Sequence, residues 1–305
     1  MAQSHDGILV FLDRDLKAPQ PALKKALLLA QASSLPLTVA VNADSPAMRR
    51  AVGGDEQRLE AAGQQIRTAW ERRIEELAGG AVLETRVNVS KDVEESLRDT
   101  VKDCRPALVV VHTSEEGTIK RHLFTPRDWM LIRRAPCAVL CVHSRPWSTV
   151  PRITMAVEPE EREDGLDATV FHAARRWGDA LQAELDAVHV LEHPDETLLL
   201  VAGEALPEYA ASSANIRDYH RKALDQFAHR HQLDADKTHL LEGPISSTLA
   251  EYCEEHGSDI LVVGTVRRNT FERLLLGATA EALLTRASND VLVIKPDGFE
   301  SDWSA

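Results

Sequence analysis

Short apolar runs alternate with longer amphipathic stretches along the whole chain. The runs are rich in Val, Ile and Leu, and they lie at 7–13, 106–113, 137–143, 153–158, 258–265 and 290–295. Unbroken runs of this kind are typical of parallel strands that are covered on both faces. The stretches between them have apolar residues at helical spacing, and they lie at 21–31, 55–77, 167–183, 208–231 and 246–256. This alternation predicts an α/β fold with parallel sheets and right-handed crossovers.

The second half of the chain repeats the order of the first. The run at 7–13 returns at 153–158, the run at 106–113 at 258–265, and the run at 137–143 at 290–295. The same order at nearly the same spacing predicts a duplication. We therefore expect two units, 1–147 and 148–305, each with a five-stranded parallel sheet. The boundary falls where two prolines bracket a polar stretch, at 145–151.

Composition and charge exclude several classes of protein. A hydrophobic content of 44% and a charged content of 27% are those of a folded globular chain. The net charge of -13 is concentrated after residue 150, where 14 Lys and Arg face 29 Asp and Glu. Such an acidic chain is not expected to bind nucleic acid or an anionic membrane. No apolar run is long enough to span a membrane, and the N-terminus does not resemble a secretion signal. With only 4 cysteines, a cytoplasmic location is the expectation.

One loop carries a candidate binding motif. After the run at 258–265 the chain reads Gly264-x2-Arg267-x9-Gly277-Ala278-Thr279. Glycines allow the backbone to approach a phosphate closely, and a helix N-terminus favours an anion. On spacing alone, a glycine that ends a strand and a helix cap explain the pattern better than a binding site does.

The same residues resemble the signature of the universal stress protein family, G-x2-G-x9-G-[ST]. An acidic residue follows the first strand of each unit, Asp13 and Glu158, as in that family. The tandem arrangement, with the stretch at 124–129, resembles the E branch of the family. The resemblance implies two Rossmann-like units of the adenine nucleotide α-hydrolase type, a role in stress response and binding of ATP, with Mg²⁺ accompanying it. The positions that it assigns to the nucleotide are Ala156, Glu158, Val190, Gly264, Arg267, Gly277, Ala278 and Thr279.

The loop also departs from the family signature. Arg267 occupies the place of the middle glycine, and Ala278 the place of the Ser or Thr. An arginine there either obstructs the phosphates or pairs with them, and we expect obstruction because close approach needs the glycine. The first unit has His112, Glu115 and Glu116 where close-approach glycines are needed, so we expect no nucleotide in it.

No other pattern predicts an enzyme or a metal site. The neighbouring histidines, His189 with His193 and His229 with His231, lack the further ligands of a zinc site. Cys137 and Cys141 share one face of a strand and are interpreted as core residues. We expect no catalytic residues. Three hypotheses remain open: a nucleotide-sensing module, an interaction protein or carrier of another small or lipid-like ligand, and a slow ATPase.

The last strand of each unit predicts how the units associate. An exposed apolar edge strand invites aggregation, so the strands at 138–143 and 291–295 are expected to pair antiparallel across a pseudo-two-fold axis. This arrangement would make the chain an internal pseudo-dimer, and further dimerisation of whole chains stays open.

Overall fold

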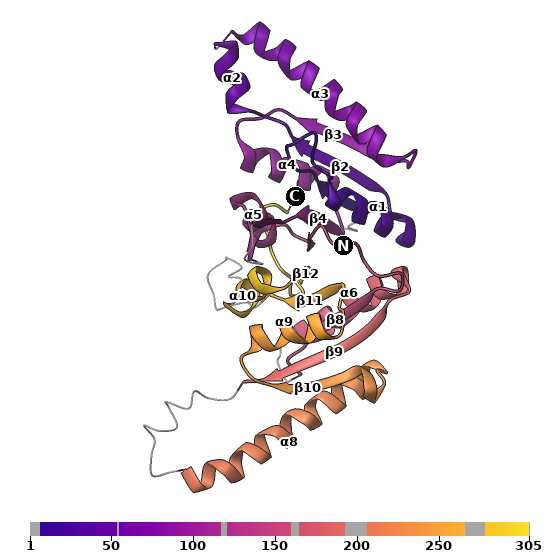
Figure 1. Cartoon of the computed structure of the whole chain (residues 1–305), viewed down its shortest axis with the longest axis vertical. Helices are drawn as coiled ribbons and strands as arrows, with labels where there is room; N and C mark the ends of the chain where they lie inside the picture. The colour runs from indigo at the N-terminus through magenta and orange to yellow at the C-terminus, as the bar shows by residue number, and fades with distance from the viewer. Residues whose placement is uncertain are drawn as a thin grey trace. The chain divides into compact units, whose positions relative to one another are not determined.

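The computed structural model describes residues 7–53, 55–116, 121–159, 165–192, 206–265 and 278–304. The first unit contains a parallel sheet of five strands in the order β3-β2-β1-β4-β7 (Figure 1). The bounds are β1 Ile8–Phe11, β2 Leu37–Asn42, β3 Glu84–Asn88, β4 Leu108–His112 and β7 Ala138–Val142. In register, Ile8 of β1 faces Leu37 on one side and Leu108 on the other. The chain thus leaves β1 toward one edge of the sheet and later returns to its other side with β4.

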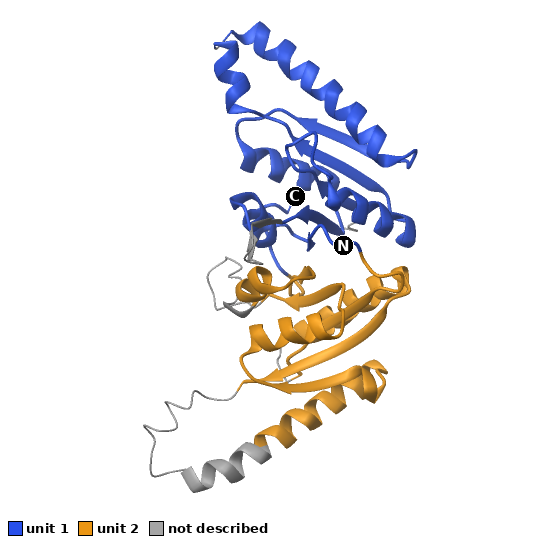
Figure 2. Ribbon diagram, viewed as in Figure 1, with its two compact units in different colours: residues 1–146, 270–274, 299–305 blue, residues 147–269, 275–298 orange. Residues whose placement is uncertain are grey.

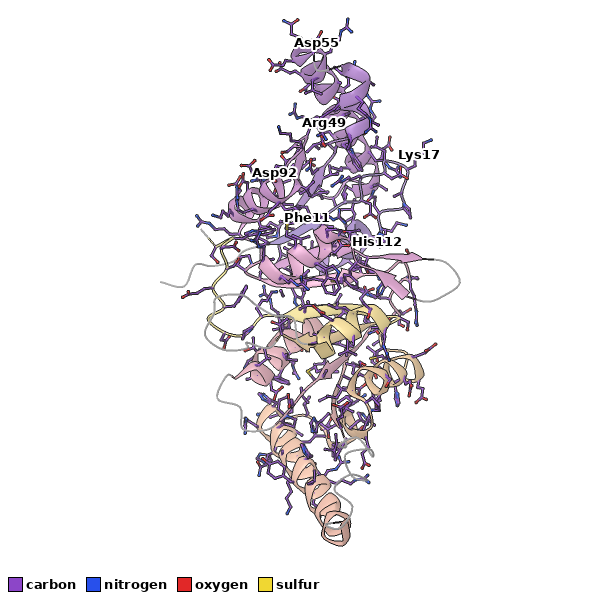
Figure 3. All side chains as sticks on the ribbon, turned by 90° about the vertical axis from the view of Figure 1, so that its left-hand side faces the viewer. Phe11, Lys17, Arg49, Asp55, Asp92 and His112 are labelled. Atoms are coloured by element: carbon purple, nitrogen blue, oxygen red, sulfur yellow. The ribbon has the colours of Figure 1, made fainter. Side chains whose placement is uncertain are left out.

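Five helices accompany this sheet: α1 Pro21–Ser33, α2 Pro46–Val52, α3 Glu56–Ala78, α4 Val93–Cys104 and α5 Pro126–Arg134. α1 packs with α3, and α4 packs with α5, so that helices cover both faces. α3 and α4 begin at side-chain caps. Asp55 accepts a hydrogen bond from Arg58 N at 3.1 Å, and Asp92 accepts one from Glu95 N at 2.9 Å. Figure 3 labels the two aspartates. Such caps satisfy backbone N–H groups that the first turn of a helix leaves without partners.

The second unit repeats this plan with a parallel sheet in the order β10-β9-β8-β11-β12. The bounds are β8 Arg152–Ala156, β9 Glu184–Leu191, β10 Thr238–Glu242, β11 Ile260–Gly264 and β12 Asp290–Ile294. Its helices are α6 Leu166–Leu181, α8 Leu206–His231, η1 Ala235–Lys237, α9 Ile245–Glu255 and α10 Ala278–Arg286. α6 and α8 meet through the rings of Phe171 and Phe227, 6.2 Å apart, and α9 packs with α10.

The apolar runs predict the central strands correctly. β1, β4, β11 and β12 are buried along nearly their whole length, and Cys137 and Cys141 lie in the core as expected. The α/β class, the two units and the five parallel strands in each are confirmed. The sequence patterns gave no range for the outer strands β2, β3, β9 and β10 or for the helices α4 and α5. They also did not predict the short helices α2 and η1, or a hairpin of β5 Ser114–Glu116 with β6 Arg121–Leu123. Within the described residues, no helix is both long and apolar enough to cross a membrane.

The C-terminal tail belongs to the first unit. The division into compact units falls between Pro146 and Trp147, but the last residues, from Phe299 on, group with the first unit (Figure 2). The hydroxyl of Ser301 donates a hydrogen bond to the carbonyl of Arg134 in α5. The Arg134 guanidinium in turn lies 3.2 Å from Asp302, and Trp303 is 1% exposed. A segment that follows the second unit in sequence therefore completes the packing of the first.

Candidate functional site

The centre of each sheet contains a topological switch point. In the first unit the chain proceeds from β1 to β2 and β3 on one side, and through β4 to β7 on the other. Ligands of open parallel sheets bind beyond the carboxyl ends of the two strands at such a point. In the first unit, the residues there are Asp13, just after β1, and His112, the last residue of β4.

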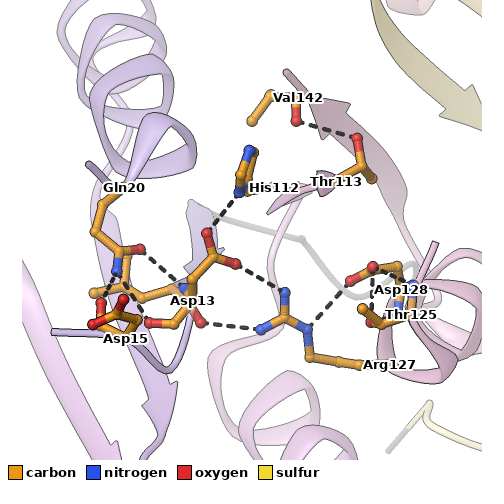
Figure 4. Close-up of polar contacts among 10 residues, drawn as sticks. Asp13, Asp15, Gln20, His112, Thr113, Thr125, Arg127, Asp128 and Val142 are labelled. Carbon is orange, nitrogen blue, oxygen red and sulfur yellow. Dashed lines mark hydrogen bonds and ion pairs between the residues drawn. The ribbon is translucent and has the colours of Figure 1, made fainter. Parts of the chain in front are cut away.

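Asp13 and His112 form a carboxylate–imidazole pair (Figure 4). His112 Nδ1 lies 2.6 Å from Asp13 Oδ2, and the two side chains are only 14% and 24% exposed. Because a carboxylate accepts hydrogen bonds, the ring proton of a neutral His112 lies on Nδ1. The backbone of Asp13 is fixed by Gln20, whose side chain accepts from Asp13 N at 2.9 Å and donates to Asp13 O at 3.0 Å. Gln20 itself adopts the left-handed backbone conformation, with φ 51°, which these contacts hold in place.

Arg127 extends the pair into a network across the switch point. Its Nη1 donates to the carbonyl of Leu12 at 3.0 Å, and its Nη2 lies 3.5 Å from Asp13 Oδ1. Its Nε donates to Asp128 Oδ1 at 3.2 Å. The other oxygen of Asp128 accepts from the backbone and the hydroxyl of Thr125, both at 2.8 Å, which forms a capping box at the start of α5 (Figure 4). All three guanidinium nitrogens are thus used within the protein.

The second unit has different residues at the equivalent positions. Thr113 and Thr265, which follow β4 and β11, each donate two hydrogen bonds to one carbonyl of the next strand, that of Val142 or Ile294. Because Thr113 and Thr265 make the same contact, they are equivalent positions. The residues directly before them are then equivalent as well, and Gly264 corresponds to His112. The nine-residue helices α5 and α10 are aligned by the same shift of the numbering, and Thr279 therefore corresponds to Arg127.

The predicted nucleotide positions that the structure describes lie at neighbouring strand ends. Ala156 ends β8 and Gly264 ends β11, while Val190 lies near the end of β9 and is 7% exposed. Glu158 is exposed, and its backbone N–H donates to Asp167 Oδ1 at 2.9 Å. Arg267 and Gly277 lie outside the described residues, as do the side chains of Ala278 and Thr279.

Gly264 also has a packing role. A Cβ added there would lie 2.8 Å from Cγ and Cδ2 of Leu166, the first residue of α6. Carbon atoms do not approach so closely, so a larger residue would displace Leu166. Close approach of α6 to the sheet is therefore one physical reason for glycine at this strand end, whether or not a ligand binds.

Gly264→Ala is expected to destabilise the second unit by about 1–3 kcal/mol, the usual cost of overpacking. Urea unfolding checks this value. Leu166→Ala should remove the clash, so that adding Gly264→Ala to it costs much less than in the wild type. An equal cost in both backgrounds would contradict the packing explanation.

Histidines of the second unit pair across elements rather than along the sequence. His189, on β9, contacts His220 of α8, with Nε2 and Nδ1 2.8 Å apart. His193, its neighbour in the sequence pattern, lies outside the described residues. His231 packs between the rings of Phe171 and Phe227 at 4.1 and 4.5 Å. In the part of the chain that the structure describes, no group of three or more His, Cys, Asp or Glu could hold a metal ion.

Comparison with known proteins identifies the family. The model of the universal stress protein family matches residues 5–143 and again residues 151–295. The chain belongs to the universal stress protein family. It is 26% identical to universal stress protein E of Photorhabdus laumondii over 97% of both chains. It is 27% identical to universal stress protein E of Escherichia coli K12, over 97% of this chain and 96% of that protein.

Solved structures show the same fold. A candidate universal stress protein of Pseudomonas aeruginosa UCBPP-PA14 superposes with a TM-score of 0.72 at 24% identity, covering 97% of this chain and 95% of that one. A universal stress protein of Archaeoglobus fulgidus DSM 4304 reaches 0.59 at 14% identity, covering 94% and 98%. The tandem form that the sequence resemblance predicted is thus confirmed, and the two matched segments are its two universal stress protein units.

Proposed function

We propose that this universal stress protein is a stress-response binding module with one adenine-nucleotide site, in its second unit. The observation that carries the proposal is the difference between His112 and Gly264. At the switch point of the first unit an imidazole occupies the strand end, whereas the equivalent strand end of the second unit has no side chain. Glycine at this place is also the feature that the family signature requires.

The network in the first unit argues against a nucleotide there. A triphosphate at the start of α5 would have to take Arg127 away from Leu12 and Asp13, and it would meet the carboxylates of Asp13 and Asp128. Two carboxylates beside a polyphosphate are unfavourable because like charges repel. The first unit therefore replaces a ligand with its own side chains.

The second unit would hold ATP in the way that the family resemblance implies. Ala156, Glu158 and Val190 surround the adenine, and backbone amides from Gly277 to Thr279 face the phosphates at the start of α10. Helix N-termini bind phosphate through such N–H groups. Mg²⁺ would be coordinated mainly by the phosphates, because Mg²⁺ usually has few protein ligands when it binds a nucleotide.

Calorimetric titration with ATP and Mg²⁺ tests the proposal. We expect one weak site per chain, and tighter binding by Arg267→Gly, because this change restores the glycine of the signature. If Arg267 instead pairs with a phosphate, the variant loses about 1.5–3 kcal/mol, which is about ten- to a hundredfold in affinity. Asp99→Ala, an exposed change in α4 of the first unit, serves as the control and should leave one site.

The alternatives predict different results in the same experiment. Two sites per chain would contradict the assignment of the network in the first unit. No binding by the wild type or by Arg267→Gly would refute the nucleotide site and favour an interaction protein or a carrier of another ligand. Release of phosphate from labelled ATP at stoichiometric protein would identify a slow ATPase.

A further inference from the structure

Both backbone polar groups of Val157, the residue before Glu158, form hydrogen bonds with residues of β9. Val157 N donates to the carbonyl of Val188 at 3.0 Å. The carbonyl of Val157 lies 3.0 Å from Nδ1 of His189, a side chain that is 4% exposed. Val157 stands between Ala156 and Glu158, two positions of the proposed adenine pocket. The imidazole of His189 therefore fixes the backbone at the wall of that pocket.

The protons of His189 follow from its two contacts. A carbonyl oxygen only accepts hydrogen bonds, so Nδ1 of His189 carries a proton. In the neutral ring Nε2 then has a lone pair and accepts from Nδ1 of His220, 2.8 Å away on α8. The pair can hold one further proton, on His220. With both rings charged, two N–H groups would point at each other, and the contact between β9 and α8 would break.

In the first unit, a permanently charged side chain donates a hydrogen bond to the equivalent carbonyl. Leu12 N donates to Ala40 O, as Val157 N donates to Val188 O, so the carbonyls of Leu12 and Val157 are equivalent. The carbonyl of Leu12 accepts from Arg127, which keeps its charge at every physiological pH. In the second unit His189 performs this task, and histidine, unlike arginine, is a residue type that can change its charge.

We propose that His189 is a positioning residue of the adenine pocket and that its contact with His220 makes the pocket sensitive to acid. Uptake of the second proton separates α8 from β9, frees the ring of His189 and loosens the backbone at Val157. The effect on nucleotide affinity rests on the proposed function, whereas the effect on α8 does not. By linkage, a bound nucleotide would strengthen the docking of α8.

Other charged groups lie on the helix and at the strand ends that flank the pair. On α8, Arg217 and Arg221 disfavour a second proton, although Arg217 is held by Glu242 of β10 at 2.9 Å. Acidic groups that favour it lie on α8, after β8 and β9, and at the end of β10; they are Asp218, Glu158, Glu192 and Glu242.

Protonation of two further histidines destabilises the folded protein in acid, independently of the pair. Burial lowers the pKa of His231, helped by His172 and Arg230, and burial also lowers the pKa of His239. A lowered histidine pKa means that the folded state resists protonation. Their effect therefore starts as pH falls below about 6.5, the usual pKa of histidine, and it must be separated from that of the pair.

His220→Asn is the variant that separates these effects. An asparagine amide nitrogen stands close to the place of Nδ1, so it keeps a donor for His189 but takes up no proton. Mg-ATP affinity is measured by calorimetry at pH 5.5 and 7.5. Amide exchange of α8 and of residues 153–159 is measured without nucleotide at the same two pH values. His231→Phe serves as the control for the other buried histidine of α8.

For the wild type we expect affinity about five- to tenfold weaker at pH 5.5, the effect of about one lost hydrogen bond, and faster corrected exchange in both segments. His220→Asn should show neither change, whereas His231→Phe should keep both. An equal acid response of His220→Asn and the wild type would overturn the inference, as would unchanged exchange in the wild type. If no nucleotide binds at either pH, the proposed function fails, and the exchange of both segments still decides the role of His189 and His220.

Discussion

Asp128→Ala is expected to destabilise the first unit by about 3–5 kcal/mol, the cost of breaking a buried ion pair on one side. Asp128 is buried, and its carboxylate accepts from Thr125 and from Arg127. Its removal leaves the guanidinium of Arg127 without one of its two carboxylates and deprives α5 of its capping box. Urea unfolding, followed by amide exchange of α5 and β4, measures the loss in this unit.

Two controls define what the loss means. Asp99→Ala removes an exposed acid of α4 that contacts Arg98, and it should cost less than about 1 kcal/mol. Adding Arg127→Met to Asp128→Ala should recover part of the stability, because it removes the charge that was left behind. A loss below about 1 kcal/mol for Asp128→Ala would show that water satisfies Arg127 and that the network is not a closed unit.

Trp303→Ala is expected to destabilise the first unit, although the tail follows the second unit in sequence. Trp303 is 1% exposed, and truncation of a buried tryptophan costs about 3–5 kcal/mol. Amide exchange should therefore accelerate in α5 and β4 and stay unchanged in β9 and β10. Ser304→Ala, next to it and exposed, is the matched control. Faster exchange in β9 and β10 instead would contradict the assignment of the tail to the first unit.

The sequence predicts best the elements that are buried on both faces. β4 and β11 are apolar along nearly their whole length because helices cover both sides of the sheet. Such runs can be recognised from the sequence alone. α2 has no buried residue and leaves no periodic pattern. The three-residue strands of the β5–β6 hairpin are too short for alternation to reveal them.

The site is predictable only in part, for a different reason. Asp13 and His112 are recognisable as residues at the ends of apolar runs, but their contact joins positions 99 residues apart. Arg127 lies in a stretch that the family resemblance singled out, yet nothing local shows that it reaches Leu12. His220 pairs with His189 only because α8 packs on β9, a tertiary contact that no sequence spacing encodes.

The C-terminal tail has a consequence for biosynthesis. Ser301 lies 167 residues after Arg134, the residue that it contacts in α5. A ribosome therefore completes all other parts of the first unit long before it adds the residues that close this unit's packing. Domains generally fold from the N-terminus as they are made. The first unit of this chain differs in one respect, because it lacks the packing of Ser301 and Trp303 until the second unit has also been made.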